Sequence, residues 1–237
     1  MPTYGLYLST LVHEFSGIYV RKLSKFIHIP DKNIDETILN KIYQLPSSLK
    51  EINLNISTGK VVEYREKDLI HDNKDNPAAA LVIYQAHLEN NGINLKKPIK
   101  SLSYLNNTKN SIGKMIPAGN YIIMKRISYK ESKNRIVTGI LFEEDFEHEF
   151  MSVENHLNYI HNKGSGIEKD LVIGLNAYLN SKTLDNYIRR FSGHTQINAS
   201  DILSLPMPNY ETLINLGKEI IINKINEEEI EKLIFKE

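Results

Sequence analysis

The sequence contains no cysteine among its 237 residues. Disulfide bridges, zinc sites with thiolate ligands and cysteine nucleophiles are therefore excluded. No stretch approaches the uninterrupted apolar length that a membrane-spanning helix needs. The first 17 residues lack the basic and apolar regions of a signal peptide. We therefore expect a soluble, cytoplasmic protein.

The chain also lacks a net charge, because 29 lysines and arginines balance 29 aspartates and glutamates. A generic nucleic-acid binder would be basic overall. The charges are unevenly distributed, however: between Asn94 and Arg135 there are ten basic residues and one acid, Glu131. A segment this basic can follow a phosphate backbone, although a solvated lysine-rich surface explains it equally well on charge alone.

The hydrophobic pattern places strands first and helices last. A helix is expected at residues 35–45, and extended runs at 52–56, 60–64, 80–84, 121–126, 135–142 and 155–161. From residue 167 an apolar stripe predicts a helix that breaks near Ser181. The tail is helical, and Asn226 caps its last helix. This order predicts an α+β domain over residues 1–208, with a mixed or antiparallel sheet and packed helices, and a helical C-terminal appendage at 209–237.

Residues 191–206 read FSGHTQINASDILSLP. This run resembles a block of the gamma-class adenine-specific DNA methyltransferases of restriction–modification systems, in which it lies in the target-recognition region after the catalytic domain. Further segments resemble the same family in the same order: ISTGKVVEYR at 56–65, YIIMKRIS at 121–128, ENHLNYIH at 154–161, and the helix at 175–190. The resemblance spans residues 57–208. A looser likeness, a helix followed by a polar turn and a Leu-Pro stop, links the chain to specificity subunits of type I restriction systems.

The chain departs from that family where catalysis takes place. The family's Asn-Pro-Pro-Tyr motif has no counterpart, since Asn76-Pro77 is followed by three alanines. Lys163-Gly164-Ser165-Gly166 has too few glycines for the turn that holds S-adenosylmethionine, and is interpreted as a flexible connector. We therefore expect no catalytic site and no cofactor in this chain.

The resemblance accordingly implies a sequence-specific DNA recognition domain. Its expected partners are double-stranded DNA and a methyltransferase catalytic domain, on the same or another chain, that binds S-adenosylmethionine; no membrane is involved. Three alternatives stay open: a nuclease, a specificity-subunit part of a restriction enzyme, and an assembly module that binds no DNA. A nuclease would need a clustered acidic metal site. His156 and His161, five residues apart on an expected strand, point to opposite faces, so we expect no metal site there.

The candidate DNA contacts fall into a basic and a polar group. The basic candidates surround an expected strand–turn–strand or close a helix: Lys125, Arg126, Lys130, Lys133, Arg135, Arg189 and Arg190. Strand alternation puts Lys125 and Arg126 on opposite faces, so both cannot serve one contact. For the two helix-closing arginines a structural role is favoured, because cations stabilise the negative end of a helix.

The polar candidates are His194, Gln196 and Asn198, whose side chains are of kinds that donate to or accept from base edges. Short polar side chains between two helices are, however, often used to bond backbone groups and to shape turns. A block shared by enzymes that read different sequences should also be architectural. We therefore expect these side chains to hold the turn together rather than to read bases.

Overall fold

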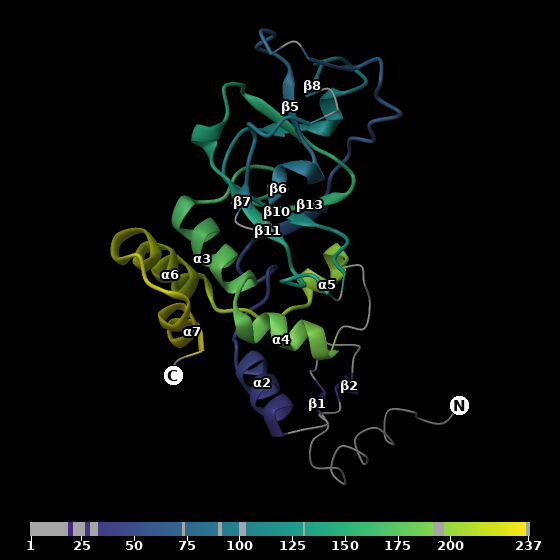
Figure 1. Ribbon diagram of the computed structural model, residues 1–237. Coiled ribbons are helices and arrows are strands. Elements are labelled where there is room, and N and C mark those ends of the chain that lie inside the picture. The colour runs from purple at the N-terminus through teal and green to yellow at the C-terminus, as the bar shows by residue number, and fades with distance from the viewer. Residues whose placement is uncertain are drawn as a thin grey trace, which may run out of the picture.

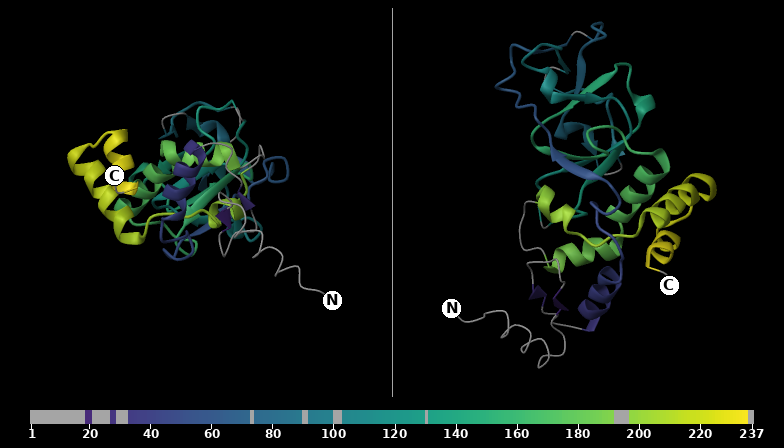
Figure 2. Two further views of the ribbon diagram at one scale, coloured as in Figure 1. Left: turned by 90° about the horizontal axis from the view of Figure 1, so that it is seen from below. Right: turned by 180° about the vertical axis from the view of Figure 1, so that it is seen from behind.

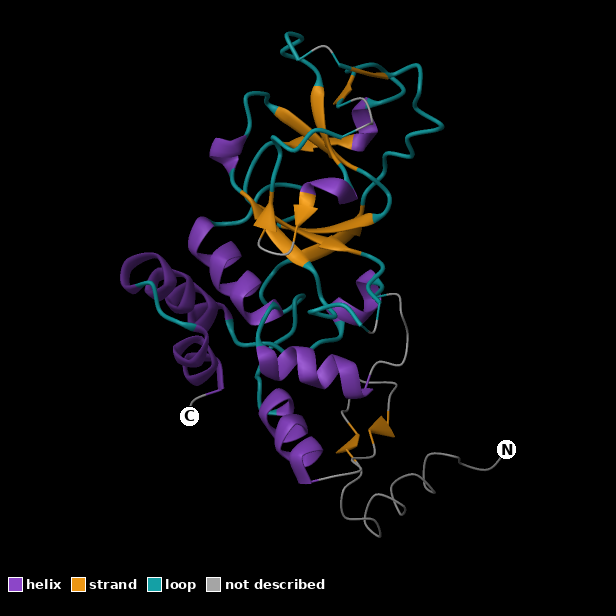
Figure 3. Cartoon of the chain, viewed as in Figure 1, coloured by secondary structure: helices purple, strands orange, loops and turns teal. Residues whose placement is uncertain are grey.

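The computed structural model describes residues 19–20, 27–28, 33–72, 74–89, 92–99, 103–129, 131–191 and 197–235, and the description below is confined to them. The molecule has a small sheet at one end, a second sheet in the middle and a group of helices beyond it (Figure 1 and Figure 3). Strands and helices are thus segregated, and the α+β class expected from the sequence is confirmed.

The central sheet is antiparallel and contains, in spatial order, β11 (Thr138–Leu141), β10 (Tyr121–Lys125), β13 (Leu157–His161) and β3 (Asn55–Thr58). Side chains alternate between its two faces, as they must on a pleated strand. Ile122 and Met124 of β10 join the core beneath the helices, whereas Tyr121 and Ile123 join the core between the two sheets. The sheet is therefore covered on both faces, which fixes its register.

The second sheet is mixed, with the order β4 (Ile70–His71), β8 (Tyr104–Leu105), β5 (Ala80–Ile83), β12 (Phe150–Val153) and β9 (Met115–Pro117). Strands β5 and β12 run parallel. Two further ribbons are β1 (Tyr19–Val20) with β2 (Ile27–His28), and β6 (Leu88–Glu89) with β7 (Gly92–Ile93). Single 3-10 turns occupy η1 (Gln85–His87), η2 (Ile112–Lys114) and η3 (Glu143–Asp145).

The helical level contains α2 (Asn33–Tyr43), α3 (Lys169–Leu179), α4 (Lys182–Phe191), α5 (Ala199–Leu203), α6 (Tyr210–Asn223) and α7 (Glu227–Phe235). Helix α2 packs against α4, and α3 lies between the central sheet and α6. Helices α6 and α7 lie on the opposite side of the helical group from α5 in each view (Figures 1 and 2). The side of the molecule that carries α6 and α7 is thus separated from the side that carries α5 by the helices between them.

Helices α3 and α6 cross at a pair of glycines. A Cβ atom added at Gly174 would overlap the carbonyl oxygen of Leu213, and one added at Gly217 would overlap that of Asp170. Glycine is thus required at both positions because each backbone fills the space of the other's side chain. Leu213, Leu216 and the α7 residue Ile234 belong to the same core as α3. The domain boundary expected at residue 208, before the helical C-terminal appendage, stays a prediction.

Several sequence-based expectations are confirmed. The expected helix at 35–45 is α2, and the break near Ser181 separates α3 from α4. Asn226 caps α7: its side-chain oxygen accepts from the N–H groups of Glu228 at 2.9 Å and Glu229 at 3.1 Å. The Glu229 carboxylate in turn accepts from the Asn226 N–H at 2.8 Å. This reciprocal pair is a complete capping box, which fixes where the last helix begins.

Three expected strands differ from the structure. The run expected at 52–56 is extended only from Asn55, because the N–H groups of Ile52 and Asn53 donate to the carbonyls of Ser48 at 3.2 Å and Lys50 at 3.1 Å and form a turn. Residues 60–64 form a turn with one isolated bridge, from Val61 to Glu154. The cause is the Glu66 carboxylate, which accepts from the Val62 N–H at 2.7 Å and closes the turn. The expected run at 135–142 is extended only from Thr138, because the Arg135 N–H donates to the side chain of Asp185 at 2.6 Å. At Val62 a carboxylate four residues away accepts the backbone N–H, and at Arg135 the carboxylate that does so lies 50 residues away on α4.

Candidate nucleic-acid interface

The ends of four strands lie together on one side of the central sheet, and the connecting loops leave the sheet there. The strands are antiparallel, and Lys125 pairs with Leu157 while Asn158 pairs with Thr58, so the ends of β10 and β3 lie beside the start of β13. The start of β11 lies there as well, since Thr138 pairs with Met124. We call the connections that emerge here, residues 59–66, 126–137 and 154–156 together with 197–198, the loop edge.

Hydrogen bonds to backbone carbonyls join the four parts of the loop edge. The Arg126 guanidinium donates through Nη1 to the carbonyl of Asn155 at 2.7 Å. The Asn155 N–H donates to the carbonyl of Val61 at 2.9 Å, and the Ile197 N–H donates to the carbonyl of Arg126 at 2.9 Å. Three of the five segments that resemble the methyltransferase family thus meet as neighbouring strands and loops, and the block at 191–206 reaches them at Ile197.

The segment 128–135 is held in place by helix α4. Asp185 accepts from the Arg135 N–H through Oδ1 and from the Arg189 Nε through Oδ2, each at 2.6 Å. Arg189 Nη2 then donates to the carbonyls of Ser132 at 2.6 Å and Lys133 at 2.8 Å. Charge-assisted bonds of this kind are the stronger ones. Arg189 is thus bonded within the protein, to Asp185 and residues 132–133 rather than to the carbonyl end of its own helix, and its DNA contact stays a prediction.

Arg135 is a correction to the expected set of DNA contacts. Its side chain is 1% exposed, although the sequence pattern predicted a phosphate contact. The Arg135 Nε lies 3.4 Å from the Ser128 hydroxyl oxygen, and that hydroxyl donates to the Arg135 carbonyl at 2.6 Å. The side chain is therefore folded inward to hold the base of the loop. A buried guanidinium of this kind cannot reach a phosphate in this conformation.

Lys125 and Arg126 lie on opposite faces of β10, as the alternation predicted. Lys125 follows Tyr121 and Ile123 toward the core between the sheets and is half-buried. Burial lowers its pKa, and the nearby charge of Lys97 lowers the pKa further. Arg126 points instead into the loop edge, where it contacts Asn155. Of this pair, Arg126 is the residue that belongs to the interface.

The remaining residues expected to contact DNA are either exposed or lie outside the described residues. Lys133, Arg190 and Asn198 are exposed at or beside the loop edge. Arg190 lies at the end of α4 with its Nη1 3.2 Å from the Asn186 side-chain oxygen. Lys130, His194 and Gln196 lie outside the described residues, so their roles stay predictions.

At Asn198 the turn is built differently from the expectation. Its backbone is the N-cap of α5, and its N–H donates to the Asp201 carboxylate at 2.7 Å. The Asn198 side chain itself does not cap the helix and is exposed. Asp201, which the sequence reasoning did not single out, therefore does the capping. The Asn198 amide remains directed at solvent, where a base or phosphate could meet it.

Further exposed residues of the loop edge were missed by the sequence reasoning. Tyr64 is 66% exposed, and the Arg65 guanidinium lies over its ring at 5.4 Å from the centroid. Ile127 is 47% and Tyr129 68% exposed. An aromatic or aliphatic residue directly beside an arginine, at Tyr64-Arg65 and Arg126-Ile127, was the signal available in the sequence. The loop edge thus combines cations with exposed apolar side chains, the combination that nucleic-acid interfaces use.

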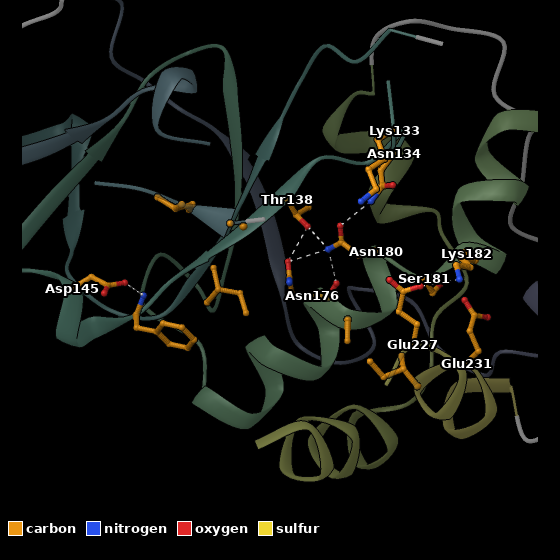
Figure 4. A pocket seen from close by; sticks show the side chains of 17 residues that line it. Lys133, Asn134, Thr138, Asp145, Asn176, Asn180, Ser181, Lys182, Glu227 and Glu231 are labelled. Carbon is orange, nitrogen blue, oxygen red and sulfur yellow. Dashed lines mark hydrogen bonds and ion pairs between the residues drawn. The ribbon is translucent and has the colours of Figure 1, made fainter. Parts of the chain in front are cut away.

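A cavity among the described residues lies away from the loop edge. It has a volume of about 880 Å³ and lies between β11, α3, the start of α4 and α7 (Figure 4). At its floor Thr138 donates to Asn176 at 2.8 Å, and Asn180 donates to Thr138 at 2.7 Å. At its rim Lys182 pairs with Glu227 at 2.8 Å. These polar groups are bonded to each other, so the cavity does not present a converging set of groups to a ligand.

The two sequence segments compared with methyltransferase motifs are both bonded within their own turns. Residues 163–166 form an ordered tight turn rather than the expected flexible connector, with φ of 49° at Lys163 and 91° at Gly164. The Gly164 N–H donates to His161 Nδ1 at 2.7 Å, and the Ser165 N–H donates to the Asn162 carbonyl at 2.8 Å. These donors are therefore occupied within the turn. The Asn76 side chain likewise accepts from the Ala78 N–H at 3.1 Å.

In the part of the chain that the structure describes, no group of three or more histidine, aspartate or glutamate side chains is arranged to hold a metal ion. No described helix is long and apolar enough to cross a membrane.

Comparison with known proteins links this chain to methyltransferases. It is 37% identical over 209 residues to the Type II methyltransferase M.BsuBI of Bacillus subtilis, and 31% identical over 214 residues to the Type II methyltransferase M.PstI of Providencia stuartii. Each match covers 88% of this chain and 41% of the relative. The chain is therefore homologous to Type II methyltransferases and spans about two fifths of the length of these relatives. No family model matches.

A solved structure of a type I R-M system contains a chain with a distant likeness to this one. The TM-score is 0.46 at 12% sequence identity, and the match covers 84% of this chain and 45% of the other. So distant a likeness says nothing about function.

Proposed function

We propose that this chain is the sequence-specific DNA recognition domain of an adenine-specific DNA methyltransferase in a restriction–modification system. The observation that carries the proposal is the homology to Type II methyltransferases over 88% of the chain. The recognition role is supported by the segments that resemble the target-recognition region, because these build the central sheet and its loop edge. The adenine specificity rests on the same resemblance.

The loop edge has the chemistry that duplex DNA requires. Lys60, Arg65, Lys133 and Arg190 are exposed there or at the adjoining end of α4. Lysine and arginine bind phosphates and release the counterions that surround them, which supplies sequence-independent affinity. Such contacts fix the position of the protein, while base edges are read by groups that enter a groove. Asn198, with its exposed amide, is a candidate for that second role.

We assign the methyl-transfer reaction to a part of the methyltransferase outside these residues. We assign S-adenosylmethionine and the target adenine to a methyltransferase catalytic domain, on the same or another chain. The residues described here contribute by holding the duplex in register with that domain. A target base must leave the helix before it can be methylated, so recognition has to precede chemistry.

An assembly module is the second candidate, and one observation favours it. Ile221, Ile222 and Leu233 of the C-terminal helices are 46%, 72% and 44% exposed. Exposed apolar side chains that lie near one another are typical of protein interfaces. Helices α6 and α7, which carry these residues, lie on the opposite side of the helical group from α5 (Figure 2). A protein partner at this face would leave the loop edge open for DNA, so the two candidates are compatible.

The test is a fluorescence anisotropy titration of the chain with random duplex DNA at several salt concentrations. We expect binding that weakens with salt, and a shallower salt dependence in the double variant Lys133→Ala, Arg190→Ala. Each lost phosphate contact removes about 0.9 from the slope of log affinity against log salt. The control with the same charge change is Lys218→Ala, Lys232→Ala on α6 and α7. Equal slopes in both variants, or no binding by the unaltered chain, would contradict the proposal.

A further inference from the structure

Two large apolar side chains are exposed within the most basic part of the loop edge. Ile127 is 47% exposed and Tyr129 is 68% exposed. They lie between Arg126, which contacts Asn155, and Lys133, which is exposed. Single exposed apolar residues are normal, but exposed apolar groups gathered within a polar rim are typical of interaction sites, and Ile127 and Tyr129 lie two residues apart among cations.

Hydrogen bonds hold the described residues of the loop that carries them. The Tyr129 N–H donates to the Ser132 hydroxyl, and the Ser132 N–H donates back to the Tyr129 carbonyl, each at 3.1 Å. The Ser128 hydroxyl donates to the Arg135 carbonyl at 2.6 Å, which closes the base of the loop. Asp185 and Arg189 fix residues 132–135 from helix α4. Side chains on a loop of this kind lose little conformational entropy on binding.

The chemistry of DNA restricts what such side chains can contact. In the major groove the base pairs present hydrogen-bond donors and acceptors, and the apolar group among them is the C5 methyl of thymine. The neighbouring cations draw the loop to the phosphates on either side of the groove. Charge complementarity and apolar exposure therefore coincide on one short loop.

We infer that Ile127 and Tyr129 read thymine methyl groups in the major groove, and that Asp185 and Arg189 are the positioning residues of this reading loop. The inference rests on the proposed function and deepens it, since it assigns part of the sequence specificity to residues 127–129. It assigns no thymine reading to the block at 191–206, which contacts this loop through the bond from the Ile197 N–H to the Arg126 carbonyl.

The experiment replaces thymine by uracil, which removes the methyl group and leaves the hydrogen-bonding edge unchanged. The preferred duplex is first selected from a random pool with the unaltered chain. Each thymine is then replaced in turn, and affinities are measured for the unaltered chain and for Ile127→Ala, Tyr129→Ala and Tyr129→Phe. Ile222→Ala, which removes an exposed isoleucine from α6, serves as the control.

We expect uracil to weaken binding of the unaltered chain about fourfold at one or two positions, because burying one methyl group contributes roughly 0.8 kcal/mol. Ile127→Ala and Tyr129→Ala should each become indifferent to the replacement at one position. Tyr129→Phe and Ile222→Ala should retain the full effect. Thermal melting should be unchanged in all four variants, since these side chains are exposed.

Two results would overturn the inference while leaving the proposed function intact. In the first, the unaltered chain binds thymine and uracil duplexes equally; in the second, the alanine variants stay as sensitive as the unaltered chain. If the unaltered chain binds no duplex, the proposed function itself fails, and this inference fails with it.

Discussion

Asp185 and Arg189, one turn apart on α4, are joined by a bond of 2.6 Å between Oδ2 and Nε. Asp185 also binds the Arg135 N–H, and Arg189 the carbonyls of Ser132 and Lys133. The pair thus fastens the basic loop to the helix beneath it. Neither residue needs to touch DNA to affect DNA binding.

Arg189→Ala should therefore lower both stability and affinity. Loss of charge-assisted bonds to partly buried carbonyls should cost roughly 1–3 kcal/mol of unfolding free energy. Binding should weaken and the thymine-to-uracil effect should shrink, because the loop that carries Ile127 and Tyr129 loses its fixed conformation. Urea denaturation and anisotropy titrations measure the two effects, and Arg190→Ala is the neighbouring control, with little expected change in stability. A stable Arg189→Ala variant with altered sequence preference would mean that Arg189 reads bases.

Gly174→Ala and Gly217→Ala should each destabilise the chain strongly. In both variants the new methyl group overlaps a carbonyl of the facing helix, and forced overpacking typically costs 1–3 kcal/mol or more. Gly113→Ala is the control, since nothing lies within 4 Å of a Cβ at that position. Thermal melting compares the three. Equal melting temperatures would show that α3 and α6 do not cross at these glycines.

Asp201→Ala should destabilise the fold by about 1 kcal/mol, the usual cost of losing a helix-capping bond. Asn198→Ala should leave the melting temperature unchanged, because the Asn198 side chain is exposed and does not cap α5. Its effect should appear in DNA binding instead. Gln196→Ala is still expected to destabilise the turn. If Asn198→Ala melts at a lower temperature than Asp201→Ala, the cap is assigned to the wrong side chain.

Stability should decrease as the pH falls from about 7.5 to about 5.5. Burial lowers the pKa of His161 below its usual value near 6.5, and burial and the charge of Lys97 do the same for His87. Below that value the unfolded chain binds protons that the folded chain does not, so protonation favours unfolding. His161 Nδ1 also accepts from the Gly164 N–H, which requires the neutral ring.

The measurement is urea denaturation at a series of pH values, for the unaltered chain and for His161→Asn. The variant should be less stable at every pH but should show a weaker decline toward low pH. The remaining decline belongs to His87. An unchanged decline in the variant would mean that His161 is protonated in the folded chain.

Isothermal titration calorimetry of this chain with S-adenosylmethionine should give no binding. The chain lacks the family's glycine-rich turn, and the donors of residues 164 and 165 are already bonded within their own turn. Titration of the cofactor into the chain mixed with a methyltransferase catalytic domain is the positive control. Stoichiometric heat with this chain alone would place a cofactor site here.

Much of the local structure followed from the sequence because its cause is local. The apolar stripe from residue 167 and the interruption at Ser181 set α3 and α4, and the Asn226 cap set α7. The strand at 121–126 was recognisable because it is almost wholly apolar and is buried on both faces. The relatives of the chain are Type II methyltransferases, in agreement with the methyltransferase resemblance of these segments.

The candidate site was decided by tertiary structure. The sequence alone does not show whether a carboxylate or carbonyl far along the chain binds a given basic residue. Arg135 is buried at the base of its loop and Arg189 bonds residues more than 50 positions earlier, whereas Lys133 stays exposed. Tyr64 and Ile127 became neighbours of the same edge only when antiparallel pairing brought the ends of β3 and β10 together. Charge and periodicity are properties of the chain, but exposure depends on contacts between segments that are far apart in it.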